Sequence, residues 1–384
     1  GINILLGKNG TGKTTLLNLI SMIVRSDLSE LANEPFKIEF DLTFDEGEVQ
    51  AIIQNHEIPA PPQVSDMLPR SFEATGDVRV FDSGGTLRCE ARAKGGQAEI
   101  RQAHEPESKT VELGTFTATS RRFLRILMAQ MEGAIRWPAG LWENAYRFDE
   151  ALGMYEFITR DESTRLSMHV STGHSRVRLG FEPPGLRKTA MQAIRQNAGY
   201  VVIDKSTLPF LKDLSQQMGF DSIGLTVSLM SRSPNPNYDR VLFSNPRFSF
   251  VHAGGELIPQ EWLSYGQKRL LSFIYYLACD PPVVIADELV NGLHHSWIEF
   301  CMAQLGERQA FLTSQNPLLF DYVPFHSPEE VKERFVLCSL EPAQDSRPRM
   351  RWYQISDEQA VAFYDAYDAD IEHVGEILRT RGLW

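Results

Sequence analysis

The sequence lacks an excess of positive charge, a long apolar run and a recognisable targeting segment. Its formal net charge of −12 at pH 7 argues against a generally basic nucleic-acid-binding protein, although a local basic groove is compatible with an acidic whole. No run of about 18 apolar residues occurs, so we expect no membrane-spanning helix. No signal peptide is visible, and because the chain starts at Gly1 inside an apolar strand, we expect further sequence before it.

Cysteine is also scarce, and no C-x-x-C pair occurs. This absence excludes zinc-finger spacings and a compact disulfide framework, and it predicts a cytoplasmic protein because the cytosol is reducing. The four cysteines are Cys89, Cys279, Cys301 and Cys338. With 384 residues, 42% of them hydrophobic and 23% charged, the chain is typical of a soluble protein with one large domain or two to three lobes.

A glycine-rich loop lies close to the start of the chain. GINILLGKNGTGKTTLLNLI predicts strand, loop and helix, and residues 7–14 fit the phosphate-loop pattern G-x-x-x-x-G-K-[ST]. Glycines let backbone N–H groups surround the phosphates, Lys13 supplies a point charge for them, and the Thr14 hydroxyl suits Mg²⁺. We therefore predict that the chain binds ATP with Mg²⁺. The candidate binding residues here are Gly7, Asn9, Gly10, Gly12, Lys13, Thr14 and Thr15.

Two carboxylates follow an apolar run later in the chain. In PPVVIADELVNGLHH, residues 283–286 predict a buried parallel strand that ends at Asp287 and Glu288. Ligands in open α/β sheets bind at the carboxyl ends of strands. We expect Asp287 to hold the Mg²⁺ shell with Thr14, and Glu288 to be the catalytic residue that polarises the attacking water.

The stretch EWLSYGQKRLL places a helix start where a second anion site could form. Ser264 offers a hydroxyl, Gly266 a bare backbone N–H, and the helix from Gln267 onward its positive end. One phosphate loop already cradles one triphosphate, so a second anion site makes sense if it caps a nucleotide held by another subunit.

LSYGQ resembles the LSGGQ signature of ABC-type ATPases, with Tyr265 in place of the first of its two glycines. Ser264 precedes Asp287 by 23 residues, the length of one helix and one strand, as in that family. The resemblance implies an α/β P-loop head that forms a homo-oligomer, at least a dimer with two shared ATP sites. In it, Ser264, Gly266 and Gln267 would contact a nucleotide bound by the partner subunit.

The residues after Glu288 resemble one branch of that family. Asn291-Gly292-Leu293-His294 is similar to the DE-x-x-NGLHP pattern of OLD-like, SMC- and RecF-related ATPases, and His294 could contact a partner subunit or have a purely structural role. TSQNP at residues 313–317 resembles a T-T/S-H-S-P switch, with Gln315 where the switch histidine stands. Gln315 can hydrogen-bond a γ-phosphate but cannot be a cation, which predicts slow or regulated turnover.

The predicted fold is an α/β ABC-type head with a mixed core sheet, an antiparallel β-lobe and an inserted helical lobe. The β-lobe is predicted from alternating segments such as FKIEFDLTF, and the helical lobe from periodic segments such as FLRILMAQMEGAIR, LRKTAMQAIRQ and LPFLKDLSQQM. No heptad run is long enough for a coiled coil. The expected segments are 1–35 (first core part), 36–120 (β-lobe), 121–245 (helical lobe), 246–325 (second core part) and 326–384 (C-terminal strand and helix).

Two weaker candidates remain in the sequence. Gln130 could be the glutamine that senses nucleotide between the lobes, but its helical setting favours a surface role. Asp368 and Asp370 form a D-x-D that invites a metal reading, yet the apolar residues around them recur at helical spacing and place the acids on a solvated face.

Three functions compete. The chain resembles stand-alone ATPases of bacterial antiphage defence, such as the AriA component of PARIS and the PtuA component of Septu. That resemblance implies a phage trigger and a separately encoded effector, a nuclease. The alternative is a RecF- or SMC-like repair ATPase that clamps DNA, for which Arg165, Arg176 and Arg178 are a possible basic patch. A transporter subunit is the third, and the DELVNGLHH text argues against it.

Overall fold

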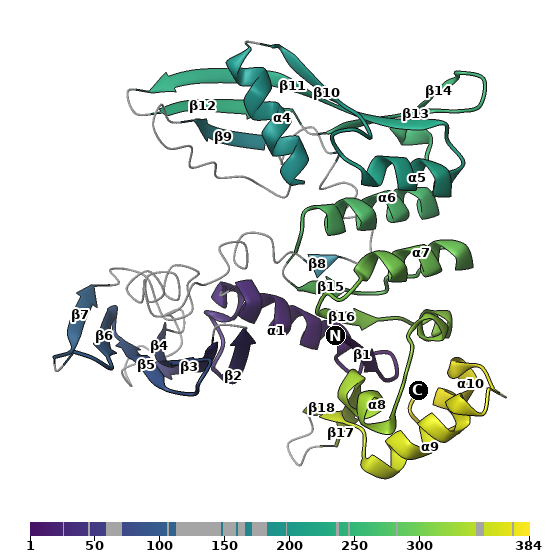
Figure 1. The fold of residues 1–384 in the computed structure, drawn as a ribbon. Helices are drawn as coiled ribbons and strands as arrows, with labels where there is room; N and C mark the ends of the chain where they lie inside the picture. Colours follow the sequence, from purple (N-terminus) through teal and green to yellow (C-terminus); the bar gives the residue numbers. More distant parts are fainter. Residues whose placement is uncertain are drawn as a thin grey trace, which may run out of the picture. The chain divides into compact units, whose positions relative to one another are not determined.

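The computed structural model contains two compact units, Gly1–Asn18 together with Glu143–Trp384 (unit 1), and Leu19–Trp142 (unit 2). Figure 1 shows the chain as a ribbon. The residues that the structure describes are 1–25, 27–44, 47–58, 71–105, 107–112, 147–148, 159, 166–170, 183–196, 198–235, 238–244, 246–281, 283–342, 349–370 and 372–384.

Unit 1 contains a six-stranded sheet, here named the core sheet, in the order β18-β17-β1-β16-β15-β8. All neighbours are parallel except β17 and β18, which pair antiparallel. The strands are β1 (Ile2–Leu6), β8 (Arg147–Phe148), β15 (Val284–Ala286), β16 (Ala310–Thr313), β17 (Phe335–Glu341) and β18 (Arg349–Gln354). This mixed sheet confirms the predicted α/β fold, and it places the carboxyl ends of β1, β16 and β15 next to one another.

The strands at the centre of the core sheet are short and apolar because helices and turns of unit 1 enclose them. All three residues of β15 are buried, as the run before Asp287 predicts. Helix α8 contacts β1 and β17, α6 contacts α7, and α10 packs on α9 and η3. These elements are α6 (Tyr265–Ala278), α7 (His295–Leu305), η3 (Pro317–Tyr322), α8 (Pro328–Arg334), α9 (Asp357–Asp368) and α10 (Val374–Thr380).

Unit 1 also contains a second sheet, in the order β14-β13-β11-β12-β9, with β10 paired to β11. Its pairs are antiparallel. Two helices, α4 and α5, contact this second sheet. The elements are β9 (Leu166–Val170), α4 (Pro184–Arg195), β10 (Tyr200–Ile203), α5 (Phe210–Met218), β11 (Ser222–Asn235), β12 (Tyr238–Phe243), β13 (Arg247–Val251), β14 (Leu257–Pro259) and η2 (Gln260–Trp262).

The second sheet corrects the expectation for residues 121–245. Helices α4 and α5 match two of the predicted helical segments, but most described residues from 200 to 243 form strands, so this part of the chain is not purely helical. Alternating Ile223, Leu225 and Val227 are buried on one face of β11, which is the pattern of a strand. FLRILMAQMEGAIR and Gln130 lie outside the described residues.

Unit 2 contains a six-stranded antiparallel meander, the β-lobe sheet, in the order β2-β3-β4-β5-β6-β7. Val49, Ala51 and Ile53 of β3 are buried at every second position, so one face carries the core of this unit, as the alternation predicts. The elements are β2 (Phe36–Phe44), β3 (Gly47–Ile58), β4 (Ser71–Asp82), β5 (Leu87–Lys94), β6 (Gln97–Gln102), β7 (Lys109–Glu112) and η1 (Ser29–Leu31).

The C-terminal acids are placed as a solvated helix face predicts. Asp365, Asp368 and Asp370 are exposed, whereas Phe363 and Ile377 are buried. Among the described residues no group of three His, Cys, Asp or Glu side chains is arranged to hold a metal ion. None of the described helices is long and apolar enough to cross a membrane.

Candidate active site

The glycine-rich loop connects β1 to helix α1 (Lys13–Arg25). Gly7 has φ 143°, and a Cβ there would lie 2.3 Å from the carbonyl oxygen of Cys338 on β17, so only glycine fits beside that strand. The Nζ of Lys13 donates to the carbonyl oxygens of Gly7 (2.6 Å) and Lys8 (3.1 Å), which places the ammonium inside the curve of the loop. Asn9 and Thr15 are exposed.

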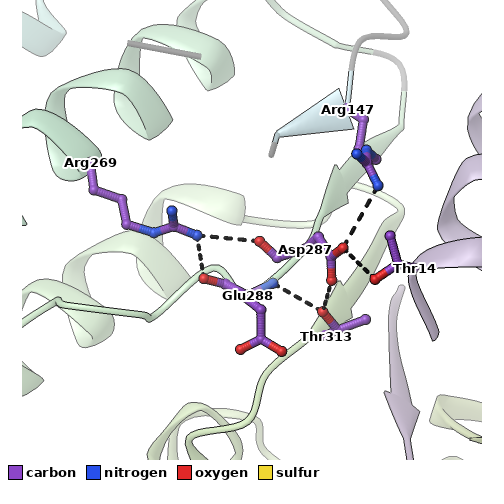
Figure 2. A network of polar contacts seen from close by, with 6 residues as sticks. All are labelled: Thr14, Arg147, Arg269, Asp287, Glu288 and Thr313. Carbon is purple, nitrogen blue, oxygen red and sulfur yellow. Dashed lines mark hydrogen bonds and ion pairs between the residues drawn. The ribbon is translucent and has the colours of Figure 1, made fainter. Parts of the chain in front are cut away.

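Asp287 joins the phosphate loop to the neighbouring strand ends. The Thr14 hydroxyl donates to Oδ2 of Asp287 over 2.8 Å, and the Thr313 hydroxyl, at the end of β16, donates to Oδ1 (Figure 2). Asp287 is 3% exposed, and Nη1 of Arg147 on β8 lies 3.7 Å from Oδ2. The structure therefore brings together the two residues that were predicted to hold the metal, although 273 positions separate them.

Glu288 follows with an unusual backbone. Its φ of 51° lies in the left-handed region, and its side chain is 5% exposed. Its N–H donates to the Thr313 hydroxyl over 3.0 Å, and its Oε2 accepts a hydrogen bond from the backbone N–H of Gln315 over 2.8 Å. The side chain of Gln315 is exposed, so the contact seen between these two candidate residues uses the backbone of Gln315.

The signature stretch forms a capped helix start. Ser264 is the N-cap of α6: its hydroxyl accepts from the N–H of Gln267 (3.3 Å), and the Gln267 side chain accepts from the N–H of Ser264 (2.9 Å). In the described part of the chain each of these side chains accepts a hydrogen bond from the backbone N–H of the other residue, and no contact links them to the phosphate loop.

The signature packs on the residues that follow Glu288. A Cβ on Gly266 would lie 2.7 Å from the carbonyl oxygen of Gly292, and a Cβ on Gly292 would lie 2.5 Å from the Tyr265 ring. Tyr265, which replaces a signature glycine, therefore lies directly against the loop that begins with the two carboxylates. That loop, residues 287–293, is called the carboxylate loop below.

One family model matches this chain. It carries the description "AAA domain, putative AbiEii toxin, Type IV TA system" and matches residues 164–321, less than half of the chain. The matched residues include the signature stretch, Asp287 and Glu288, and they leave out the phosphate loop at residues 7–14. Among curated proteins nothing matches.

Solved structures with similarity to the chain include SMC heads. The Smc head bound to the C-winged helix domain of ScpA is 13% identical over 93% of this chain and 91% of that chain, with a TM-score of 0.38. The SMC head domain from Thermotoga maritima is 12% identical over 92% and 90%, with a TM-score of 0.35. At these scores the fold assignment rests on the sheet order and motif placement described above.

The donor set at Asp287 fits a magnesium ion. Mg²⁺ is a hard cation that takes one or two protein oxygens and completes its shell with water and phosphate. Here Thr14 offers a hydroxyl oxygen and Asp287 a carboxylate oxygen, on adjacent elements. Two site neighbours, Arg147 and the buried Arg269 on α6, belong to no motif, and Thr313 was expected in the switch but not as a partner of Asp287. For Thr313 a signal existed, because it ends a strand beside the strand of Asp287.

Proposed function

We propose that this chain is an ABC-type ATPase head that hydrolyses ATP to ADP and phosphate. The observation that carries the proposal is the hydrogen bond between Thr14 of the phosphate loop and Asp287, with Glu288 as the next residue. This arrangement supports the proposal, because a candidate phosphate cradle, two candidate metal-binding oxygens and a candidate base lie at one edge of the core sheet.

Each residue has a distinct proposed role. Backbone N–H groups of residues 7–14 and the Lys13 ammonium bind the phosphates, and Thr14 with Asp287 would hold Mg²⁺, whose charge offsets that of the phosphates when it is bound. Glu288 orients the attacking water and accepts its proton. Gln315 is exposed beside Glu288 and can hydrogen-bond the γ-phosphate as a neutral group, which is consistent with slow turnover.

We further propose that a second copy of the chain completes each ATP site. Ser264 and Gln267 satisfy each other at the start of α6, and no described contact links them to the phosphate loop of the same chain. The start of α6 presents the positive end of a 14-residue helix, which suits an anion held by another subunit.

Mixing two inactive variants tests the shared site. Lys13→Ala should lose ATP binding at its own loop, and Ser264→Arg should block its own signature while its loop stays intact. A mixture should regain part of the wild-type turnover, because one composite site in each mixed dimer keeps both halves. Turnover no higher than the sum of the two variants would show that each chain works alone, whereas hydrolysis by wild type would still support the ATPase.

The biological role that we propose is control of a separately encoded effector, a nuclease, in antiphage defence. The description of the matching family model names a toxin of a type IV TA (toxin–antitoxin) system. This description supports a role in defence. A net charge of −12 and a neutral Gln315 also suit a regulatory ATPase better than a DNA clamp. The possible basic patch of Arg165, Arg176 and Arg178 lies outside the described residues and adds no support for DNA binding.

Affinity purification of Glu288→Gln from its native host in Mg·ATP tests this role. The variant should keep ATP and remain in its closed assembly, so bound partners stay with it. Mass spectrometry should find a nuclease or toxin that is absent from a parallel purification of Lys13→Ala. DNA protected from nuclease digestion, without a protein partner, would replace the defence role by a repair clamp.

A further inference from the structure

Among the described residues of unit 1, one arginine is fully buried. Arg269 of α6 is 2% exposed and is the largest fully buried side chain of the described residues. Removing a permanent cation from water costs several kcal/mol unless its surroundings compensate. A helix that only had to fill a core would carry an apolar residue there, so the contacts of this guanidinium are informative.

Arg269 is directed at the backbone of the carboxylate loop. Its Nη2 donates to the carbonyl oxygens of Asp287 (3.2 Å) and Glu288, and its Nε donates to that of Leu289 (3.0 Å). Figure 2 shows the guanidinium on the opposite side of the carboxylate loop from Thr14. The ring of Phe148 lies under the guanidinium, with its centroid 5.1 Å from Cζ. The planar guanidinium of Arg269 thus donates hydrogen bonds to three consecutive backbone carbonyl groups.

The middle peptide of the three belongs to Glu288, whose left-handed φ is unfavourable for a residue with a Cβ. Such a conformation persists only where neighbours over-determine it. Here the N–H of Glu288 is held by the Thr313 hydroxyl and its carbonyl by Arg269. The direction in which the Glu288 carboxylate points therefore depends on both side chains.

Arg269 connects this backbone to the signature. It lies five residues after Ser264, on a helix that begins with the capped Ser264–Gln267 turn. Tyr276, two turns further along α6, accepts from the N–H of Ile285 (3.1 Å) and donates to the carbonyl of Val283 (3.3 Å). With Tyr265 against Gly292, α6 contacts the strand and loop of the carboxylates at three levels, so a tilt of α6 moves the carboxylate loop.

We propose that Arg269 is a positioning residue that transmits engagement of the signature to the catalytic Glu288 of the same chain. The proposal rests on the proposed ATPase function and adds its regulation. When Ser264 and Gly266 contact the nucleotide of the partner copy, α6 shifts as a body and Arg269 carries the carbonyl groups of the carboxylate loop with it. Engagement of the signature thereby raises the turnover at Glu288 of the same chain, and a composite site in a chain whose own signature is blocked, as in the mixture of Lys13→Ala and Ser264→Arg, keeps only part of the wild-type rate.

A double-mutant cycle tests the coupling. Arg269→Lys keeps the charge but replaces the fork by one point donor, and it should lower kcat by about 10²-fold while changing the Kd for ATP by no more than about threefold. Because Arg269 acts through Glu288, adding Arg269→Lys to Glu288→Gln should cause no further loss of kcat. Arg308→Lys is the matched control, since its side chain is 35% exposed and its ion-pair partner, Asp280, is a surface residue.

Losses that multiply in the double variant would overturn the proposal and leave Arg269 as a structural residue, with the ATPase function intact. A wild-type chain that does not bind ATP would overturn the proposed function and the coupling together. The two failures are therefore distinguishable.

Hydrogen exchange provides a readout that does not need an active Arg269 variant. In mixtures of ¹⁵N-labelled Lys13→Ala with unlabelled Ser264→Arg, the labelled copy has an intact signature but no ATP of its own. Adding Mg·ATP should change exchange at amides 287–293 of the labelled copy, although its own loop stays empty. Unchanged exchange there, with protection of the phosphate loop in the unlabelled copy, would overturn the coupling.

Discussion

The core sheet and the β-lobe sheet use strands in opposite ways. In the core sheet, β15 has three residues, all buried, and every candidate catalytic group lies just beyond a strand end. In the β-lobe sheet, β3 has 12 residues and pairs along its whole length with β4, and on the solvated face of this sheet Asp77 forms an ion pair with Arg92. The core sheet positions the loops that carry the candidate site, whereas the β-lobe sheet owes its stability to its strands. Substitutions in the core sheet should therefore change ATP binding and turnover, and those in the β-lobe sheet should not.

The largest difference should come from lysine substitutions. Lys13→Ala should abolish detectable ATP binding, because its ammonium lies inside the phosphate loop and, in the proposed function, supplies the charge for the phosphates. Lys37→Ala on β2 should leave the Kd unchanged, since Lys37 and its partner Glu39 are both more than half exposed. Isothermal titration calorimetry measures the Kd of both variants for ATP. Tight binding by Lys13→Ala would show that residues 7–14 do not bind the phosphates in the proposed way.

The second-largest difference should come from glutamate substitutions, which should change the turnover rate. Glu288→Gln should retain ATP binding and lower kcat by about 10²–10⁴-fold, the usual contribution of a general base. Glu299→Gln on the exposed face of α7 is the control and should turn over normally. Phosphate release under saturating ATP gives both rates; wild-type turnover by Glu288→Gln would remove Glu288 from the reaction.

Two glycines with nearly equal φ separate conformational strain from packing. Gly292 (φ 75°) lies against the Tyr265 ring, whereas Gly85 (φ 77°) in the β4–β5 turn has open space where a Cβ would be. Gly85→Ala should cost about 1 kcal/mol from φ alone, and Gly292→Ala about 2–4 kcal/mol together with a fall in kcat. Chemical denaturation and phosphate release measure these changes. If Tyr265→Ala restores nothing in the Gly292→Ala background, the ring contact is not the cause.

The smallest effect should come from an aspartate of the β-lobe. Asp77 forms a 3.3 Å ion pair with Arg92, and both side chains are more than half exposed. Asp77→Asn should therefore change stability by about 0.5 kcal/mol or less and leave the ATPase rate unchanged. Asp287→Asn, at 3% exposure with two hydroxyl donors, should abolish turnover. Comparable effects of the two substitutions would contradict the division between the sheets.

The features that could be predicted from the sequence are those whose residues lie within one short segment. The phosphate loop, the carboxylates after β15 and the β-lobe strands each lie within one short segment, so their residue types and spacing suffice. The second sheet was missed because α4 and α5 suggested a helical lobe, although the alternation of β11 was available. Arg269 was unpredictable in physical terms: in QKRLLSF it looks like part of a solvated basic turn, and only the tertiary contacts bury its guanidinium.

The place of β1 in the core sheet has a consequence for biosynthesis. This strand pairs with β16 and β17, so its hydrogen-bonding partners are residues 310–313 and 335–337. During translation the phosphate-loop strand must therefore remain unpaired until more than 300 further residues have left the ribosome. The β-lobe strands, which pair only with their neighbours in the chain, can form in the meantime. A ribosome stalled before β16 would therefore display a folded β-lobe beside an exposed apolar strand, the state in which this chain is most prone to aggregate.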